Sequence, residues 1–294
     1  MAFDPAQHLN PEQLRAVTAP DGPVLVIAAA GTGKTRTLTH RVAWLVLENN
    51  VDPRNVLLLT FTNRAAREML ERAAQLIGGD VGGLWGGTFH HAANRMLRRH
   101  AALLGYGPDY TILDEDDSAR LLKACIAELG LKDKKFPKAT VLGSVFGLAA
   151  NRGADVGATV RAHFEEHAVD VEAVLRVHAL YEKRKRGLNA MDFDDLLVNG
   201  LKLLQEHADV AARYQERMRH VLVDEYQDTN KLQSDFVDLI AARHRNLLAV
   251  GDDFQSIYSW RGAEVKNILS FRDRYPDATI FKLEENYRSV PGIL

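Results

Sequence analysis

The chain has 294 residues, of which 46% are hydrophobic and 26% charged, and its net charge at pH 7 is −2. These values suit a soluble globular protein of about two domains, and they exclude a disordered chain and a uniformly basic nucleic-acid binder. The single cysteine, Cys125, excludes an intramolecular disulfide, and without an apolar run of ~20 residues or a signal-peptide core we expect a cytoplasmic protein with no membrane partner.

The first predicted element is a short helix over residues 9–17. Asn10 suits the N-cap and Pro11 the first helical position. Gln13 follows one turn later, just before a loop rich in small residues. Its amide has both a donor and an acceptor, so it could read the edge of an adenine. A solvated helix glutamine is an equally good interpretation of this stretch.

Residues 24–36, VLVIAAAGTGKTR, predict a phosphate-binding loop between a buried strand and a helix. Small side chains let backbone N–H groups approach an anion, and the helix N-terminus directs further N–H groups at it. Lys34 would reach the outer phosphates of a nucleotide, and the Thr35 hydroxyl would bind Mg²⁺. Ala28 stands where the usual pattern has its first glycine. A turn that is merely rich in small residues would not require Gly33-Lys34-Thr35 in this context.

Two further strand-to-helix junctions follow. Residues 55–61 predict a second buried strand, which leads into a helix at Thr62 and Asn63. A third junction lies at residues 86–90, before a helix that runs to about residue 104. Polar groups at the carboxyl ends of such strands could line a groove for a phosphate backbone. Ordinary helix capping by Thr and Asn explains them equally well.

From residue 105 to 189 the strand–helix alternation stops and helical patterns dominate, which predicts an inserted helical subdomain. The basic run Lys183, Arg184, Lys185 and Arg186 lies near its end. Such a run is usually a solvated face, although over a DNA groove it would add salt-dependent affinity. A helix is then expected over residues 190–204, with acids in its first turn.

A strand over residues 220–223 ends in two adjacent acids, Asp224 and Glu225. Asp224 can hold Mg²⁺, and Glu225 can orient and deprotonate a water molecule. Either acid alone would be weak evidence, because strands often end in an acid. Downstream of a phosphate loop, the pair favours hydrolysis of ATP over mere binding.

The remaining pattern predicts a helix over residues 231–243 and strands over residues 246–250 and 279–283. The first of these strands precedes Gln255, a neutral group that could sense a terminal phosphate. Tyr258, Trp260 and Arg261 then combine aromatic rings with a guanidinium, which can stack on bases of any identity. Tyr287 and Arg288 follow the last strand as a stacking platform and a cation.

In this order the motifs resemble those of the superfamily 1 DNA helicases of the UvrD/Rep/PcrA type. The matching stretches are LNPEQ, AAAGTGKTRT, LTFTNRAAREM, GTFHHAANRML, MDFDDLL, VLVDEYQDTN, VGDDFQSIYSWRGA and LEENYRS. They cover nearly the whole chain outside the inserted segment. DEYQDTN and QSIYSWRGA are much more specific to that family than the phosphate loop is.

The resemblance implies an ATP-dependent DNA helicase or translocase that uses Mg²⁺. It assigns Glu225 as the catalytic base, Asp224 and Thr35 as Mg²⁺ ligands, and Gln255 and Arg288 as sensors of the γ-phosphate. The implied nucleotide-binding residues are Gln13, Ala28, Ala29, Ala30, Gly31, Thr32, Gly33, Lys34, Thr35, Arg36 and Tyr287, with Arg36 and Tyr287 on the two faces of the adenine. The implied contacts to single-stranded DNA are Phe61, Asn63, Thr88, His90, Tyr258, Trp260 and Arg261.

The same resemblance predicts an α/β fold with a RecA-like parallel sheet flanked by helices. The RecA-like domain would comprise residues 1–104 and 190–282, interrupted by an all-helical subdomain over residues 105–189. Residues 283–294 would begin a second RecA-like domain, whose absence makes the chain a fragment. The family moves 3′ to 5′ on single-stranded DNA and acts at single-strand/duplex junctions. We expect a monomer that binds ATP and DNA weakly and does not unwind DNA alone.

Other functions remain open from the sequence. A nucleotide-dependent DNA-binding or regulatory module without motor activity would share the same phosphate loop. A metabolic P-loop kinase would need an acceptor site, where this chain has DNA-like aromatic residues. Stimulation of ATP hydrolysis by single-stranded DNA separates the motor from the other two.

Overall fold

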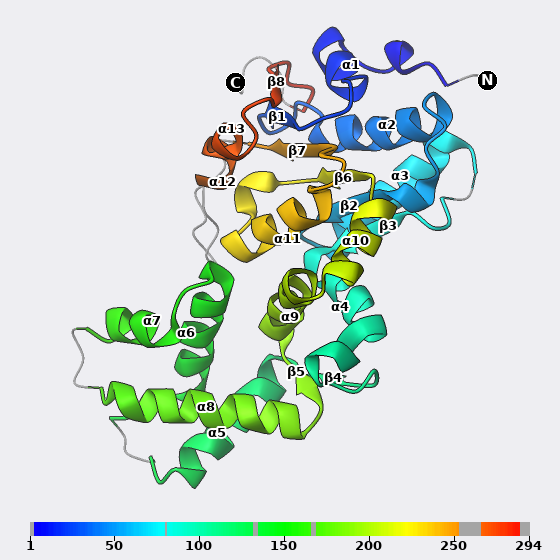
Figure 1. Cartoon of the computed structure of the whole chain (residues 1–294). Coiled ribbons are helices and arrows are strands. Elements are labelled where there is room, and N and C mark those ends of the chain that lie inside the picture. Colours follow the sequence, from blue (N-terminus) through cyan, green and yellow to red (C-terminus); the bar gives the residue numbers. More distant parts are fainter. Residues whose placement is uncertain (1–2, 80, 132–134, 166–168, 253–265, 289–294) are drawn as a thin grey trace. The chain divides into compact units, whose positions relative to one another are not determined.

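The computed structural model describes residues 3–79, 81–131, 135–165, 169–252 and 266–288 (Figure 1). The chain forms two compact units. The first comprises Met1–Ala92, His207–Thr229 and Ser234–Leu294, and the second comprises Ala93–Glu206 and Asn230–Gln233. No helix in the described part of the chain is long and apolar enough to cross a membrane.

The first unit is built on a parallel sheet with the strand order β3-β2-β6-β7-β1-β8. The strands are β1 (Val24–Ala28), β2 (Val56–Thr60), β3 (Trp85–Thr88), β6 (His220–Val223), β7 (Leu247–Gly251) and β8 (Thr279–Leu283). The carboxyl ends of parallel strands lie at one edge of a sheet. The loops after β1, β6, β7 and β8 therefore share that edge, as do those after β2 and β3.

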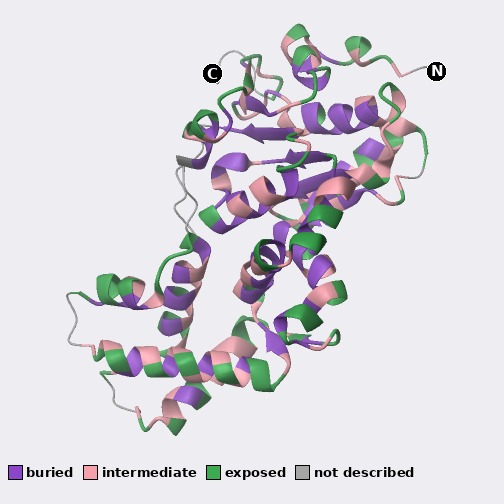
Figure 2. Cartoon of the chain, in the orientation of Figure 1, coloured by how far each residue is buried: buried purple, intermediate pink, exposed green. Residues whose placement is uncertain are grey.

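Helices cover both faces of this sheet. They are α1 (Pro11–Val17), α2 (Lys34–Leu47), α3 (Asn63–Ile77), α10 (Ala208–Arg217), α11 (Lys231–Ala241), α12 (Lys266–Leu269) and α13 (Phe271–Arg274), with the short 3₁₀ turns η1 (Pro5–Gln7), η2 (Pro53–Asn55) and η4 (Tyr226–Asp228). In Figure 1, α2 and α3 lie on one face and α11 on the other. Figure 2 shows the strands buried between these layers.

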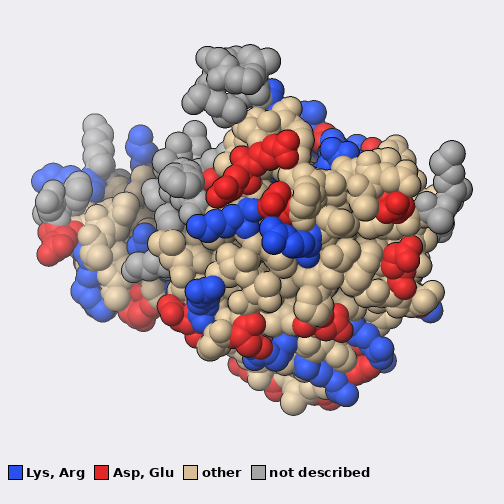
Figure 3. Space-filling view, turned by 90° about the horizontal axis from the view of Figure 1, so that it is seen from above, with Lys and Arg blue, Asp and Glu red and all other residues tan. Residues whose placement is uncertain are grey.

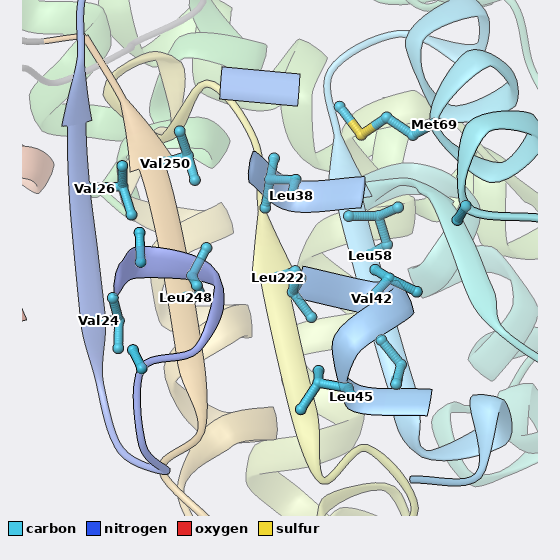
Figure 4. Packing of buried hydrophobic residues seen from close by; sticks show 14 of the residues in the cluster. Val24, Val26, Leu38, Val42, Leu45, Leu58, Met69, Leu222, Leu248 and Val250 are labelled. Atoms are coloured by element: carbon cyan, nitrogen blue, oxygen red, sulfur yellow. The ribbon is translucent and has the colours of Figure 1, made fainter. Parts of the chain in front are cut away.

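Successive side chains of each strand point to opposite faces of the sheet, and this alternation explains how the core is built. Val24 and Val26 of β1 and Leu248 and Val250 of β7 point towards α2, where Leu38 packs against them (Figure 4). The residues between them, such as Leu25 and Ala249, are also buried and face the opposite layer. Both faces of these strands are therefore apolar, as a parallel sheet with helices on each side requires. The predicted α/β fold class is confirmed.

The second unit is mainly helical and has its own apolar core. Its elements are the later part of α4 (Phe89–His100), η3 (Ala101–Leu104), α5 (Glu115–Glu128), α6 (Ala139–Arg152), α7 (Val156–His163), α8 (Val171–Gly187) and α9 (Phe193–Glu206), with the short parallel strands β4 (Thr111–Ile112) and β5 (Ala190–Met191). Leu122, Leu142 and Val177 lie at the centre of the core. This unit is wider than the predicted insert, because η3 and α9 also belong to it.

Two predictions for this region are wrong. The helix expected from residue 190 begins only at Phe193, because Ala190–Met191 form a strand. The predicted insert is not all-helical either, because β4 (Thr111–Ile112) lies within it. Asp192 and Asp195 explain the later start, because each accepts a hydrogen bond from the backbone N–H of the other, at 2.9 and 3.0 Å. This reciprocal arrangement is a capping box, which fixes the first turn of α9.

In the basic run at the end of α8, Lys183 and Arg186 are exposed, whereas Arg184 and Lys185 pair with acids. Lys185 is 2% exposed and its Nζ lies within 2.8 Å of carboxylate oxygens of Glu182, Asp192 and Asp195. Arg184 pairs with Glu128. Lys185 therefore joins α8 to the capping box of α9 as a buried counter-ion.

Replacing Lys185 by Met should strongly destabilise the second unit, because it leaves buried acids without a counter-ion. Removal of one partner of a buried ion pair typically costs about 3–5 kcal/mol of unfolding free energy. Urea unfolding measures this, with Lys183→Met as the matched control, since Lys183 is exposed two residues earlier on the same helix. Equal stability of the two variants would contradict the assigned role of Lys185.

Stability should also depend on Asp195 near neutral pH. Burial, followed by the charge of Asp192, raises the pKa of Asp195 to about 7. The folded state thus keeps a proton that the unfolded chain releases near pH 4, so this contribution to stability falls as the pH rises towards 7 and above. The variant Asp195→Asn lacks this titration. Its unfolding free energy relative to wild type should increase between pH 5 and pH 8, and a pH-independent difference would refute the assignment.

Candidate functional site

The loop between β1 and α2 has the tight geometry predicted for it. Gly31 and Gly33 have positive φ angles of 82° and 91°, which glycine adopts readily. A Cβ on Gly33 would lie 2.5 Å from Nε2 of Gln13, so a side chain there would displace the Gln13 amide. Thr32 Oγ1 donates a hydrogen bond to the Ala29 carbonyl at 2.7 Å, which closes the turn. Gly33 then caps α2, whose first turn contains Lys34 and Thr35.

Gln13 is buried against this loop, so the interpretation of a solvated glutamine is wrong. Gln13 is only 1% exposed, and its Nε2 donates a hydrogen bond to the Thr32 carbonyl at 2.8 Å. Its Oε1 accepts from the Asn10 backbone N–H at 3.2 Å, completing a capping box at the start of α1. Both ends of the Gln13 amide therefore form hydrogen bonds around the loop. Its predicted contact with the adenine edge stays a prediction.

Lys34 and Glu225 meet directly. Lys34 Nζ lies 2.8 Å from Glu225 Oε2 and 3.9 Å from Asp252 Oδ2. The side chain of Lys34 is 10% exposed and that of Glu225 is 35% exposed. The sheet order explains this meeting, because β7 alone separates β1 from β6 and all three strands end at the same edge. The phosphate-loop lysine and the paired acids thus face one another, as expected.

Asp224 has the properties of a metal ligand. The residue is 4% exposed, and its Oδ1 is buried with no hydrogen-bond partner among the described residues. Burial, with the Glu225 charge as the second cause, raises the pKa of Asp224 to about 7. A buried carboxylate oxygen without a donor is costly unless a cation binds it. This oxygen and the Thr35 hydroxyl are hard ligands of the type that Mg²⁺ prefers, so the residues fit a magnesium ion.

Gln227 and Asp252 complete this arrangement, and neither was among the predicted site residues. Gln227 Nε2 donates to Glu225 Oε2 at 2.8 Å, while its Oε1 accepts from the Asp252 backbone N–H at 2.9 Å. A Cβ on Gly251 would lie 2.7 Å from that Oε1, so a side chain there would displace the Gln227 amide. Glu225 itself has φ of 48°, a backbone conformation unusual for a non-glycine residue. The available signal for Gln227 and Asp252 was their place in the stretches VLVDEYQDTN and VGDDFQSIYSWRGA, which match the family.

The segment after β8 reaches the same edge. Tyr287 N donates to the Gly31 carbonyl at 2.9 Å, and the Tyr287 hydroxyl accepts from Asn10 Nδ2 at 2.9 Å. Tyr287 is 52% exposed, and Arg288 and Arg36 are also exposed. These three predicted nucleotide contacts therefore lie beside the phosphate loop with accessible side chains. Their individual roles stay predictions.

The predicted DNA contacts form a second group, at the carboxyl ends of β2 and β3. Phe61 is half-buried, with its ring 5.6 Å from that of Phe89. Asn63 is exposed at the start of α3, and His90 is half-buried at the start of α4. Thr88 Oγ1 accepts from His91 N at 3.2 Å, as in ordinary capping. The remaining members, Tyr258, Trp260 and Arg261, lie outside the described residues, as does Gln255.

Charge on the face seen in Figure 3 is mixed rather than uniformly basic, because Lys and Arg side chains lie among Asp and Glu side chains. This agrees with the net charge of −2. Any contact to a nucleic acid therefore depends on local groups and not on a broad electrostatic field.

Comparison with known proteins identifies relatives over nearly the whole chain. The family model described as "UvrD/REP helicase N-terminal domain" matches residues 9–276. The ATP-dependent DNA helicase PcrA of Staphylococcus aureus strain Mu50 is 41% identical over 287 residues, which are 98% of this chain and 39% of the relative. That of Bacillus subtilis is 42% identical over 288 residues, which are 97% and 38%. The chain thus spans about two fifths of the length of these curated relatives.

Asp224→Asn should raise the free energy of unfolding in Mg²⁺-free buffer at pH 8, because it removes a buried charge whose oxygen lacks a donor. We expect a gain of about 1–2 kcal/mol, measured by thermal or urea unfolding. The control is Glu225→Gln, which removes the same charge from the next residue but also loses the pair with Lys34, so no gain is expected. Destabilisation by Asp224→Asn would contradict the account of this carboxylate.

Proposed function

The chain belongs to the UvrD/REP helicase N-terminal domain family, and from that premise we propose that it is the ATP-binding motor part of a DNA helicase. Its substrates would be ATP with Mg²⁺ and single-stranded DNA. Together with a second RecA-like domain, it would couple ATP hydrolysis to movement 3′ to 5′ along one DNA strand and act at single-strand/duplex junctions.

The observation that carries this proposal is the meeting of Lys34 with Glu225 beside the buried Asp224 oxygen. A domain that only binds a nucleotide needs the phosphate loop but not a carboxylate pair opposite it. Here Asp224 and Thr35 would hold the magnesium ion, which neutralises charge on the phosphates. The arrangement fits an ATPase better than a passive nucleotide-binding module.

In this proposal Lys34 exchanges its partner when ATP binds. Its ammonium group would move from Glu225 to the outer phosphates, because these carry the greater negative charge. Glu225 would then be free to accept a proton from the attacking water. Gln227 would keep the Glu225 carboxylate in place, because its amide is anchored to the Asp252 backbone at the end of β7.

The proposed DNA contacts use the other half of the same edge. Phe61 offers a half-exposed ring, backed by Phe89, on which a base can stack. Asn63 and His90 offer polar groups near the same strand ends, suitable for phosphate oxygens. These residues follow strands of the same sheet that bears the phosphate loop. The sheet would therefore couple DNA binding to the nucleotide site.

Nucleotide binding tests the first part of the proposal on this chain. The wild type should bind Mg²⁺–ATP weakly, and Lys34→Ala should reduce the affinity at least about tenfold, because a charge-assisted contact contributes about 1.5–3 kcal/mol. The control is Lys123→Ala, since Lys123 is exposed on α5. Isothermal titration calorimetry measures both. Equal affinities for the two variants would overturn the assignment of Lys34.

Hydrolysis tests the motor. Loss of an arginine from the partner domain costs about 10³–10⁵ in turnover in other P-loop enzymes, so we expect little hydrolysis and no unwinding by the chain alone. Joined to a second RecA-like domain, it should show hydrolysis stimulated by single-stranded DNA and abolished by Glu225→Gln. Hydrolysis that ignores DNA would favour a nucleotide-dependent regulatory module instead.

A further inference from the structure

Three consecutive carbonyl groups of the phosphate loop are bound from outside the loop. The Ala30 carbonyl accepts from Asn286 Nδ2 at 2.8 Å. The Gly31 carbonyl accepts from Tyr287 N at 2.9 Å, and the Thr32 carbonyl accepts from Gln13 Nε2 at 2.8 Å. Two of these donors belong to the segment that follows β8. That segment therefore continues alongside the loop after β8 and β1 have paired as strands.

These contacts determine where the N–H groups of the loop point. In a trans peptide the N–H lies opposite to the preceding C=O, and all described peptides are trans. The Asn286 contact therefore turns the N–H of Gly31 away from Asn286, and the Gln13 contact turns the N–H of Gly33 away from Gln13. Backbone N–H groups that converge on one concavity form a site for an anion.

Asn286 makes a second contact that links the loop to Arg288. Its Oδ1 accepts from the Arg288 backbone N–H at 2.9 Å, while its Nδ2 binds the Ala30 carbonyl. The two contacts require a donor at one end of the side chain and an acceptor at the other, which an amide supplies and a carboxylate does not. Gly31 leaves room for this approach, since a Cβ there would lie 2.7 Å from Arg288 Cβ and 2.9 Å from Asn286 Oδ1.

We propose that Asn286 is a positioning residue for the phosphates of the nucleotide. Its amide directs the N–H of Gly31 into the phosphate site and fixes the backbone at Arg288, so that the loop and the arginine are set by one side chain. This inference rests on the proposed function, because it concerns the same nucleotide. It predicts that phosphate affinity depends on the amide donor and not only on the fold of the segment.

Two variants separate these roles. Asn286→Ala removes both contacts, whereas Asn286→Asp keeps the acceptor for Arg288 and loses the donor to Ala30. Asn49→Ala serves as the control, because Asn49 is an exposed asparagine just after α2. Titration calorimetry with Mg²⁺–ATP and Mg²⁺–ADP measures affinity, and thermal unfolding measures stability.

Asn286→Ala should weaken ATP binding by about five- to tenfold, the effect of one lost hydrogen bond, with an unfolding temperature close to that of wild type. Asn286→Asp, whose carboxylate is ionised at pH 8, should lose at least as much affinity, although it keeps the acceptor for the Arg288 N–H. A role limited to holding the backbone at Arg288 would instead leave the affinity of Asn286→Asp near that of wild type.

The outcomes distinguish this inference from the proposed function. If the wild-type chain does not bind ATP, the proposed function and this inference both fail. If the wild type binds ATP and Asn286→Ala binds within twofold of it, the inference alone fails. It also fails if Asn286→Asp binds ATP within twofold of wild type, or if both variants lose affinity only in proportion to lost thermal stability, because either result indicates a purely structural role.

Discussion

The arrangement of the site depends on the ion pair between Lys34 and Glu225. Its two residues are distant in sequence, and they meet because β7 alone separates the strands that precede them. The apolar core between the sheet and α2 fixes those strands. Several energetically unfavourable features lie at the carboxyl edge of the sheet. They are the buried Asp224 oxygen without a hydrogen-bond donor, the left-handed backbone of Glu225 and the close approach of Gly251 to Gln227. The well-packed sheet supplies the stability that allows such features to persist.

Much of the fold could be predicted from the sequence, because the apolar pattern of the strands and the motif of the phosphate loop both lie within short stretches of the chain. The strands over residues 220–223 and 279–283 have the predicted bounds. The first contains the apolar run 221–223, which is typical of a buried parallel strand. The phosphate loop was recognisable because its chemistry restricts the residues allowed at each position. Local pattern could not reveal the start of α9, because acids suit both a first turn and an N-cap, and only pairing with β4 decides that residues 190–191 are extended.

The parts of the site that could not be predicted depend on contacts between distant segments. Lys185 belonged to an ordinary basic run, and its burial follows from the carboxylates of Asp192 and Asp195 on another element. Gln227 lies within the family-specific stretch DEYQDTN, but no role was predicted for it, because its contact with the backbone of Asp252 after the neighbouring strand cannot be read from sequence. For Gln13 the sequence left a solvated side chain and a nucleotide contact equally open, and only its burial against the loop excludes the first. In each case a polar group forms a hydrogen bond or an ion pair with a partner that is distant in sequence or that its spacing does not identify.

The attachment of the segment after β8 to the phosphate loop has a mechanical consequence. Hydrogen bonds from Asn286 and Tyr287 join this segment to successive loop carbonyls. A force applied to the backbone at Arg288 is thus transmitted to the loop within a few ångströms, without passing through the sheet. A displacement of this segment would therefore also change the conformation of the phosphate loop.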